Sequence, residues 1–167
     1  EKRIFEIGGG SGTLGCLLLE DNIKYSATDV TQAFYLIQNR LFDYITNGDI
    51  NELVNQDLNI NSECIHLPYW KLWEIRKNPI DIDLVVSNHA LLEMSPNSLR
   101  FYLNFCKNAM GNSKDGLFVL DGIDFDGYIC NDGHFITYHN EVIIEDLFEK
   151  ELIQKQMDVY KKYNGRY

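Results

Sequence analysis

The chain has 167 residues, 45% of them hydrophobic, and a formal net charge of −10 at pH 7. This length suits one domain with a full core, so we expect a single domain over residues 1–167. The acidic balance leaves no basic surface of the kind that phosphate backbones need, and we predict that nucleic acid is not a partner.

Apolar runs and cysteines indicate the cellular compartment of the protein. The sequence has neither a secretory signal nor an apolar run of membrane length, so we expect a cytoplasmic protein that does not bind a membrane. The four cysteines are scattered without a CxxC pair, which favours a reducing compartment and no structural metal. Because Glu1 stands two residues before a predicted core strand, we also expect N-terminal sequence to be missing.

Predicted strands and helices alternate along the chain. Apolar runs indicate strands at 3–7, 24–29, 64–68, 82–87 and 116–121. Apolar residues at helical spacing indicate helices at 11–21 and 31–46, and a third helix that Ser95 caps and Pro96 begins. This alternation predicts an α/β fold with a Rossmann-like, doubly wound, mostly parallel sheet. In such sheets ligands bind beyond the carboxyl ends of the strands.

The remaining stretches have weaker patterns and are rich in Asn, Asp, Gly or aromatic residues. From them we expect a surface connection at 47–62 with a short helix around 52–54, an active-site lid at 122–140 with a short strand at 135–138, a helix at 141–151 and a strand at 152–163.

The junction between the first strand and the first helix carries the strongest functional signal. The apolar strand ends abruptly in glycines, and leucines at helical spacing follow at once. Glycines allow a sharp turn and let a ligand approach bare N–H groups at the start of a helix. Together with an acid that precedes them, they form the pattern Glu-x-Gly-x-Gly-x-Gly at Glu6, Gly8, Gly10 and Gly12.

This pattern, followed by a strand that ends in Thr28 and Asp29, resembles the first motif of class I S-adenosylmethionine (SAM)-dependent methyltransferases. The resemblance implies that SAM is the cofactor and S-adenosylhomocysteine (SAH) its product. It also implies that residues 8–12, Gly9 included, wrap the amino-acid part of SAM together with Glu6. In the same family the acid at the position of Asp29 holds the ribose hydroxyls.

A dinucleotide site is the alternative interpretation of the same loop. Gly10, Gly12 and Gly15 also fit the dinucleotide fingerprint, and Asp29 lies close to the expected spacing of ~20 residues. An NAD(P)-dependent oxidoreductase leaves Glu6 unexplained, however. No tyrosine of the chain has a lysine four positions on, the pair that short-chain reductases use.

The third predicted strand runs into a segment with aromatic side chains, Leu67-Pro68-Tyr69-Trp70. In the methyltransferases that the chain resembles, this position seats the adenine ring, often beside an Asp that is missing here. We therefore expect Leu67 or Tyr69 to pack against the adenine. The alternative is that Trp70 and Trp73 anchor a loop to the core.

The fourth predicted strand and the turn after it resemble the sugar O-methyltransferase family. The similar stretches are 83–86 and 92–96, although Leu91 replaces the aromatic residue of that family. The resemblance covers about residues 1–120 and implies a sugar, a sugar nucleotide or another small polar molecule as the acceptor.

Candidate catalytic residues follow the fourth strand, where the transferable methyl group lies in this fold. A hydroxyl that attacks the methyl group must lose its proton, and a His or a Glu with a raised pKa can accept it. We predict His89 as this base, Glu93 as the second choice, and Asn88 as a cofactor contact.

A metal site and two other functions are alternatives to this interpretation. Asp121, Asp124 and Asp126 are candidate metal ligands, but acids in a Gly-rich loop are commonly solvated, so we predict no metal. We predict SAM-dependent methyl transfer to a hydroxyl of a small polar acceptor. The alternatives are an NAD(P)-dependent oxidoreductase and a non-catalytic SAM-binding domain of a longer protein, and the oligomeric state is not predicted.

Overall fold

The computed structural model describes residues 2–77, 80–109, 117–121, 128–129 and 135–136. The chain divides into two compact units. The first comprises Glu1–Leu92 with Phe105–Ile123, and the second comprises Glu93–Asn104 with Asp124–Tyr167. Within the described ranges, no helix combines the length and the hydropathy needed to cross a membrane.

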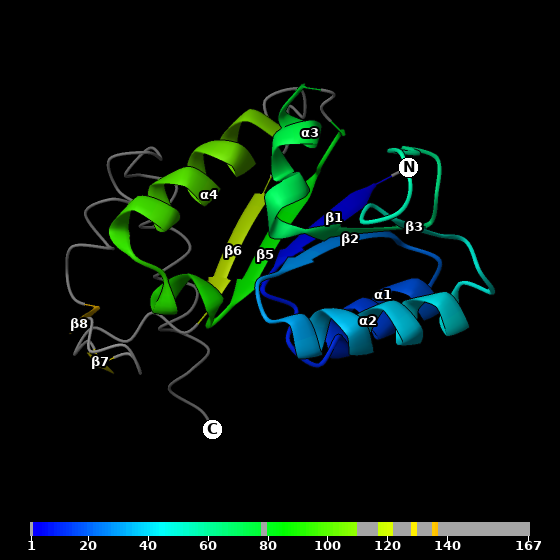
Figure 1. The fold of residues 1–167 in the computed structure, drawn as a ribbon, viewed down its shortest axis with the longest axis horizontal. Coiled ribbons are helices and arrows are strands. Elements are labelled where there is room, and N and C mark those ends of the chain that lie inside the picture. The colour runs from blue at the N-terminus through cyan, green and yellow to red at the C-terminus, as the bar shows by residue number, and fades with distance from the viewer. Residues whose placement is uncertain (1, 78–79, 110–116, 122–127, 130–134, 137–167) are drawn as a thin grey trace. The chain divides into compact units, whose positions relative to one another are not determined.

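The main sheet lies in the first unit and has six parallel strands in the order β3-β4-β2-β1-β5-β6 (Figure 1). Its strands are β1 (Arg3–Ile7), β2 (Lys24–Asp29), β3 (Ile50–Glu52), β4 (Cys64–Pro68), β5 (Leu84–Asn88) and β6 (Leu117–Asp121). Apart from the edge strand β3, this is the order 3-2-1-4-5 of a Rossmann sheet, and its topological switch point lies between β1 and β5. The predicted Rossmann-like, doubly wound, parallel sheet is confirmed.

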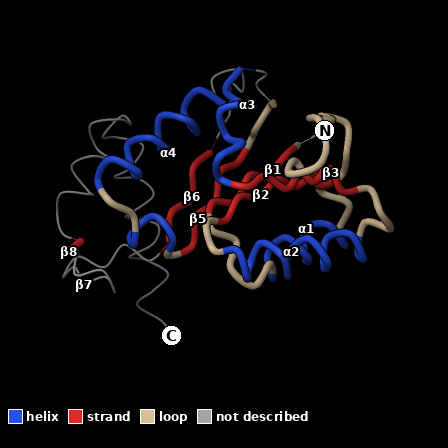
Figure 2. Tube along the Cα trace, in the orientation of Figure 1, coloured by secondary structure: helices blue, strands red, loops and turns tan. Residues whose placement is uncertain are grey.

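Helices cover both faces of this sheet. Figures 1 and 2 show α1 (Thr13–Glu20) and α2 (Gln32–Ile45) side by side on one face, with α3 (Leu72–Lys77) on the opposite face. Helix α1 begins two residues later than predicted, because Gly12 before it has a φ of +80° and so lies outside the helical region.

Shorter elements and α4 complete the described chain. They are η1 (Tyr69–Lys71), η2 (Ala90–Glu93), α4 (Pro96–Ala109) and an antiparallel pair of two-residue strands, β7 (Tyr128–Ile129) and β8 (Phe135–Ile136). Helix α4 begins as predicted, because the Ser95 hydroxyl accepts the N–H of Ser98 at 3.3 Å.

The core under α1 and α2 is built around one aromatic pair. The rings of Tyr25 on β2 and Phe42 on α2 meet edge to face, with centroids 5.4 Å apart, and both side chains are fully buried. Gly15 on α1 makes this packing possible. A Cβ atom there would lie 2.6 Å from the Tyr25 ring and 2.7 Å from the Phe42 ring.

The apolar periodicity that predicts α2 does not mark its buried face. Helix α2 buries Tyr35, Gln38 and Phe42 against the sheet and α1. Of the apolar residues at helical spacing in the sequence, Ile45 packs partly buried against the core, whereas the others remain exposed: Phe34, Ile37, Leu41 and Tyr44. The face of α2 that packs against the sheet therefore has a glutamine, Gln38, at its centre. Gln38 belongs to the candidate site.

The short helix predicted around residue 53 is wrong, because the chain there extends the sheet. Strand β3 pairs with β4, and the N–H of Leu53 continues the ladder to the carbonyl of His66 at 3.0 Å. The buried side chain of Asn51 bonds the carbonyl of Asp57 and the N–H of Asn59, at 2.9 and 2.7 Å. Asparagine side chains thus satisfy the backbone of a turn that would otherwise need secondary structure.

The remaining predicted elements lie at the end of the chain. Phe135–Ile136 is a strand, within the range predicted for one. The predicted helix at 141–151, the predicted strand at 152–163 and most of the expected lid lie outside the described residues.

Candidate functional site

The carboxyl ends of four strands bring most of the predicted site residues together. Gly8 follows β1, and its N–H donates to the carbonyl of Thr28 on β2 at 2.8 Å. Asp29 at the end of β2 is in register with Pro68 at the end of β4. On the other side of β1, a Cβ atom at Gly8 would lie 2.2 Å from Cβ of Ala90, just beyond β5. The glycine loop therefore fills the switch point between β1 and β5, where ligands bind in such sheets.

The glycine loop (residues 8–12) has a backbone that only glycine adopts easily. Gly8, Gly10 and Gly12 have φ values of +74°, +52° and +80°. A Cβ atom at Gly10 would meet nothing within 4 Å, so this part of the loop has open space beside it. A ligand can approach the backbone there without displacing a side chain.

Glu6 lies beneath the loop and is buried. The Tyr25 hydroxyl donates a hydrogen bond to its Oε2, and a Cβ atom at Gly9 would lie 3.2 Å from the same oxygen. Burial raises the pKa of the Glu6 carboxyl; the hydrogen bond from Tyr25 opposes this shift, and the Asp29 carboxylate adds to it. The acid that distinguishes the sequence motif is thus a buried carboxyl directly below the glycines.

Asp29 ties the glycine loop to α2. Its Oδ2 accepts the N–H of Gly10 at 3.0 Å and a proton of the Gln38 amide at 3.2 Å. Its Oδ1 accepts the N–H of Thr31 at 2.8 Å, just before α2 begins. A carboxylate has roughly four acceptor positions, and three protein donors leave about one of them for a ligand hydroxyl.

Gln38 belongs to this site although sequence reasoning missed it. Its side chain is completely buried, and its Nε2 donates to the carbonyl of Gly10 at 2.7 Å as well as to Asp29. Its Oε1 lies 2.8 Å from Nε2 of His66 on β4. The sequence pattern that could have indicated Gln38 is its spacing: it lies three positions after Tyr35 and four before Phe42, so the three residues share one face of α2.

His66 is buried behind Gln38 and does not face solvent. Its ring stacks on Tyr35 with centroids 4.0 Å apart, and burial lowers its pKa to about 3. The imidazole is therefore neutral at ordinary pH, with one N–H to donate and one nitrogen to accept.

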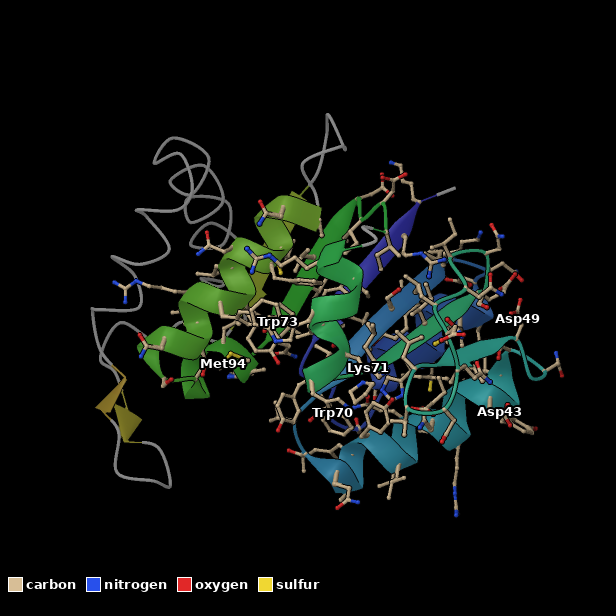
Figure 3. The ribbon with its side chains drawn as sticks, turned by 45° about the horizontal axis from the view of Figure 1, so that its top comes forward. Asp43, Asp49, Trp70, Lys71, Trp73 and Met94 are labelled. Carbon is tan, nitrogen blue, oxygen red and sulfur yellow. The ribbon has the colours of Figure 1, made fainter. Side chains whose placement is uncertain are left out.

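The segment after β4 offers an aromatic surface. Leu67 is completely buried, whereas Tyr69, Trp70 and Trp73 are about half exposed. Figure 3 shows Trp70 and Trp73 along η1 and α3, and the rings of Tyr69 and Trp70 meet edge to face at 5.2 Å. Of the two residues predicted to contact adenine, only Tyr69 exposes a ring, and both contacts remain predictions.

The end of β5 carries two exposed polar residues. Asn88 and His89 are both exposed, and His89 has a φ of +62° in the left-handed region. Non-glycine residues in this region are uncommon and concentrate at functional sites. Glu93 ends η2, but its side chain lies outside the described part of the chain.

The predicted metal candidates lie at the end of β6 and in the segment that follows it. Asp121 ends β6 with an undescribed side chain, and Asp124 and Asp126 lie outside the described residues. In the ranges that the structure describes, no group of three or more His, Cys, Asp and Glu side chains is arranged to hold a metal ion.

Charge at the site is negative. Glu6 and Asp29 are both buried under or beside the glycine loop. The hydrogen bonds described for their side chains come from neutral donors, namely the Tyr25 hydroxyl, the Gln38 amide and two backbone N–H groups. A cationic ligand would be attracted here, and an anionic one would be repelled.

Comparisons with known proteins add distant similarities only. No protein-family model and no curated protein sequence matches the chain. A SAM-dependent methyltransferase from Archaeoglobus fulgidus is 18% identical, with a TM-score of 0.43 over 65% of this chain and 40% of its own. One from Thiobacillus denitrificans, in complex with SAH, is 16% identical, with a TM-score of 0.36 over 53% of this chain and 30% of its own.

The bifunctional kinase-methyltransferase WbdD covers more of the chain. It is 11% identical, with a TM-score of 0.49 over 89% of this chain and 29% of its own. The chain thus spans well under half of the length of all three structures. Similarities this distant assign neither a site nor an activity.

Proposed function

We propose that the chain binds SAM at the glycine loop and transfers its methyl group to a hydroxyl of a small polar acceptor, such as a sugar. The observation that carries this proposal is the pair of buried acids, Glu6 and Asp29, beside a loop of bare backbone. SAM carries a positively charged sulfonium and an ammonium group, which such a site attracts. The pyrophosphate of NAD(P) is negatively charged, and the same carboxylates would repel it.

The residues present also fit the rest of SAM. The open side of Gly10 leaves room for the amino-acid part, and Asp29 keeps about one acceptor position for a ribose hydroxyl. The ring of Tyr69, 49% exposed, follows the residue in register with Asp29 and can stack on the adenine. Asn88 lies at the end of the neighbouring strand β5 and is our further candidate for a cofactor contact.

Bound SAM supplies an electrophilic methyl group that an acceptor oxygen can take up. The chain must then remove the hydroxyl proton, and His89 is our candidate for this step. Its imidazole is exposed, so a small acceptor can reach it, and the next residue in the chain, Ala90, borders Gly8. Glu93 remains the second candidate. A small acceptor of little charge is consistent with the net charge of −10, which repels polyanions.

Calorimetric titration of the chain with SAM, SAH, NADH and NADPH tests the proposal. We expect SAM and SAH to bind and the two nicotinamide cofactors not to bind. Binding of NADH or NADPH without SAM would overturn the cofactor assignment. Binding of SAM without methyl transfer to any of a panel of sugars and sugar nucleotides would favour the non-catalytic alternative.

A further inference from the structure

We infer that Gln38 is a positioning residue that sets the conformation of the glycine loop for the cofactor, and that His66 fixes the orientation of its amide. This inference rests on the proposed SAM site. It assigns a role to two buried polar side chains that the proposed chemistry does not itself use.

Gln38 and Asp29 hold the Gly10 residue from two directions. The Gly10 N–H donates to Asp29 at 3.0 Å, and the Gly10 carbonyl accepts from the Gln38 amide at 2.7 Å. The same amide nitrogen also donates to Asp29, with 3.2 Å between Nε2 and Oδ2, and this bond closes the ring of contacts. The stem of Gln38 also supports the loop, because a Cβ atom at Gly12 would lie 3.2 Å from its Cγ.

The orientation of the Gln38 amide matters because its two ends have opposite chemistry. Its NH₂ group faces two acceptors, the Gly10 carbonyl and the Asp29 carboxylate. A rotated amide would place its oxygen against both of them and leave the loop without a donor, at a cost typical of buried unsatisfied groups. Besides these two acceptors, a group that faces the oxygen on the far side of the amide constrains its orientation.

His66 supplies that constraint. Its Nε2 lies 2.8 Å from the Gln38 oxygen, and its Nδ1 contacts the side-chain oxygen of Asn39. The neutral ring has one N–H for these two oxygens, and we assign its proton to Nε2, which then donates to Gln38 and selects the amide orientation that serves the loop. The Asn39 amide then has to turn its NH₂ group toward Nδ1. Stacking on Tyr35 at 4.0 Å and an edge contact with Phe42 at 5.4 Å hold the ring in place.

The test compares three variants with wild type by calorimetric titration with SAH and by thermal unfolding. Gln38→Met keeps the volume and removes the amide. Gln32→Met is the matched control, because Gln32 is exposed on the same helix. We expect Gln38→Met to bind SAH roughly 10- to 100-fold more weakly, since a hydrogen bond to a charged group and one to a carbonyl are lost. Gln32→Met should bind as wild type does.

Gln38→Glu provides a readout that a purely structural role would not change. The titratable groups around this position are Asp29 and Tyr25 from β2, His66 from β4 and Glu6 from β1. An ionised Glu there has no donor for the loop, whereas a protonated Glu regains one. Relative to wild type at the same pH, we expect SAH affinity of Gln38→Glu to recover as the pH falls from about 8 to about 5.

Amide hydrogen exchange of the ligand-free protein gives a measurement that is independent of SAH. We expect the Gly10 N–H to exchange at least about tenfold faster in Gln38→Met than in wild type, because the loop opens locally. If Gln38→Met does not fold, Gln38→Glu provides the same comparison at about pH 8. Wild-type affinity and wild-type exchange in the Gln38 variants would overturn the inference. No SAH binding by wild type would instead overturn the proposed function, and this inference with it.

Discussion

The ends of β2 and β5 differ sharply, although both border the glycine loop. At the end of β2, Asp29 is buried and receives three hydrogen bonds from the protein. At the end of β5, Asn88 and His89 are exposed, and His89 holds a backbone conformation that its side chain disfavours. The first arrangement suits a ligand that must be held in one geometry. The second suits a group that must remain accessible to a second substrate.

Loss of the imidazole at the end of β5 should have the largest effect. We expect His89→Gly to reduce methyl-transfer turnover by about 10²–10⁴-fold, the usual contribution of a general base, with SAH affinity nearly unchanged. Glycine is the suitable replacement because φ at this position is +62°. Turnover is measured with saturating SAM on an acceptor identified from the sugar panel.

Glu93→Gln is the companion variant for that experiment. If His89→Gly retains its turnover and Glu93→Gln loses it, the base is Glu93. If both variants remain active, orientation of the acceptor rather than proton removal accounts for the rate. The exposed end of β5 then has no role in proton transfer.

At the end of β2, Asp29→Ala should weaken SAH binding by roughly 10- to 100-fold. The variant would lose the charge-assisted bond that we propose to the ribose, and it also loses the acceptor that holds the Gly10 N–H. Asp29→Asn keeps an oxygen acceptor and most of the shape, so we expect a smaller loss. Calorimetric titration measures both, and equal affinity of Asp29→Ala and wild type would contradict the assignment.

At the end of β1, Glu6→Gln should change the stability of the fold and the affinity for SAM in opposite directions. Burial raises the pKa of Glu6 in the folded state, so its ionised form disfavours folding near neutral pH. The stability that the protonated form contributes is present at low pH and is lost as the pH rises through the raised pKa. We therefore expect a higher Tm for Glu6→Gln than for wild type near neutral pH, and a difference that shrinks toward pH 4.5.

The same variant should bind SAM up to about tenfold more weakly, because one of two attracting carboxylates is gone. Thermal unfolding across pH and titration with SAM measure the two effects. A Tm for Glu6→Gln below that of wild type at neutral pH would indicate that the charge of Glu6 has a stabilising partner.

The smallest effect is expected at the aromatic segment after β4. Tyr69→Leu should weaken SAH binding by roughly 2- to 10-fold, the scale of one aromatic stacking contact, and Tyr69→Phe should retain the affinity. Trp70 and Trp73 are the two tryptophans of the chain, so their fluorescence reports ligand binding next to Tyr69. No change in affinity in Tyr69→Leu would place the adenine elsewhere.

The sequence alone determined the parts of the fold that local pattern controls. The apolar run of β1, the glycines after it and the helical spacing beyond them are adjacent in the chain, so the strand–loop–helix unit could be recognised directly. Strands β2 and β4 and the capped start of α4 were likewise predicted at their observed positions. In each case the physical cause lies within a few residues.

Only the tertiary structure decided what depends on residues far apart in the chain. Gln38 and His66 are 28 positions apart, and nothing local tells that a glutamine on α2 will meet a histidine on β4 beneath the loop. The same holds for Gly8 and Ala90, which meet because β5 pairs with β1, and for the face of α2 that is buried. Local periodicity marked an apolar stripe on α2, yet the face that packs against the sheet is a different one, with Gln38 at its centre. Buried polar groups need partners, and the partners of Gln38 lie on the loop and on two strands.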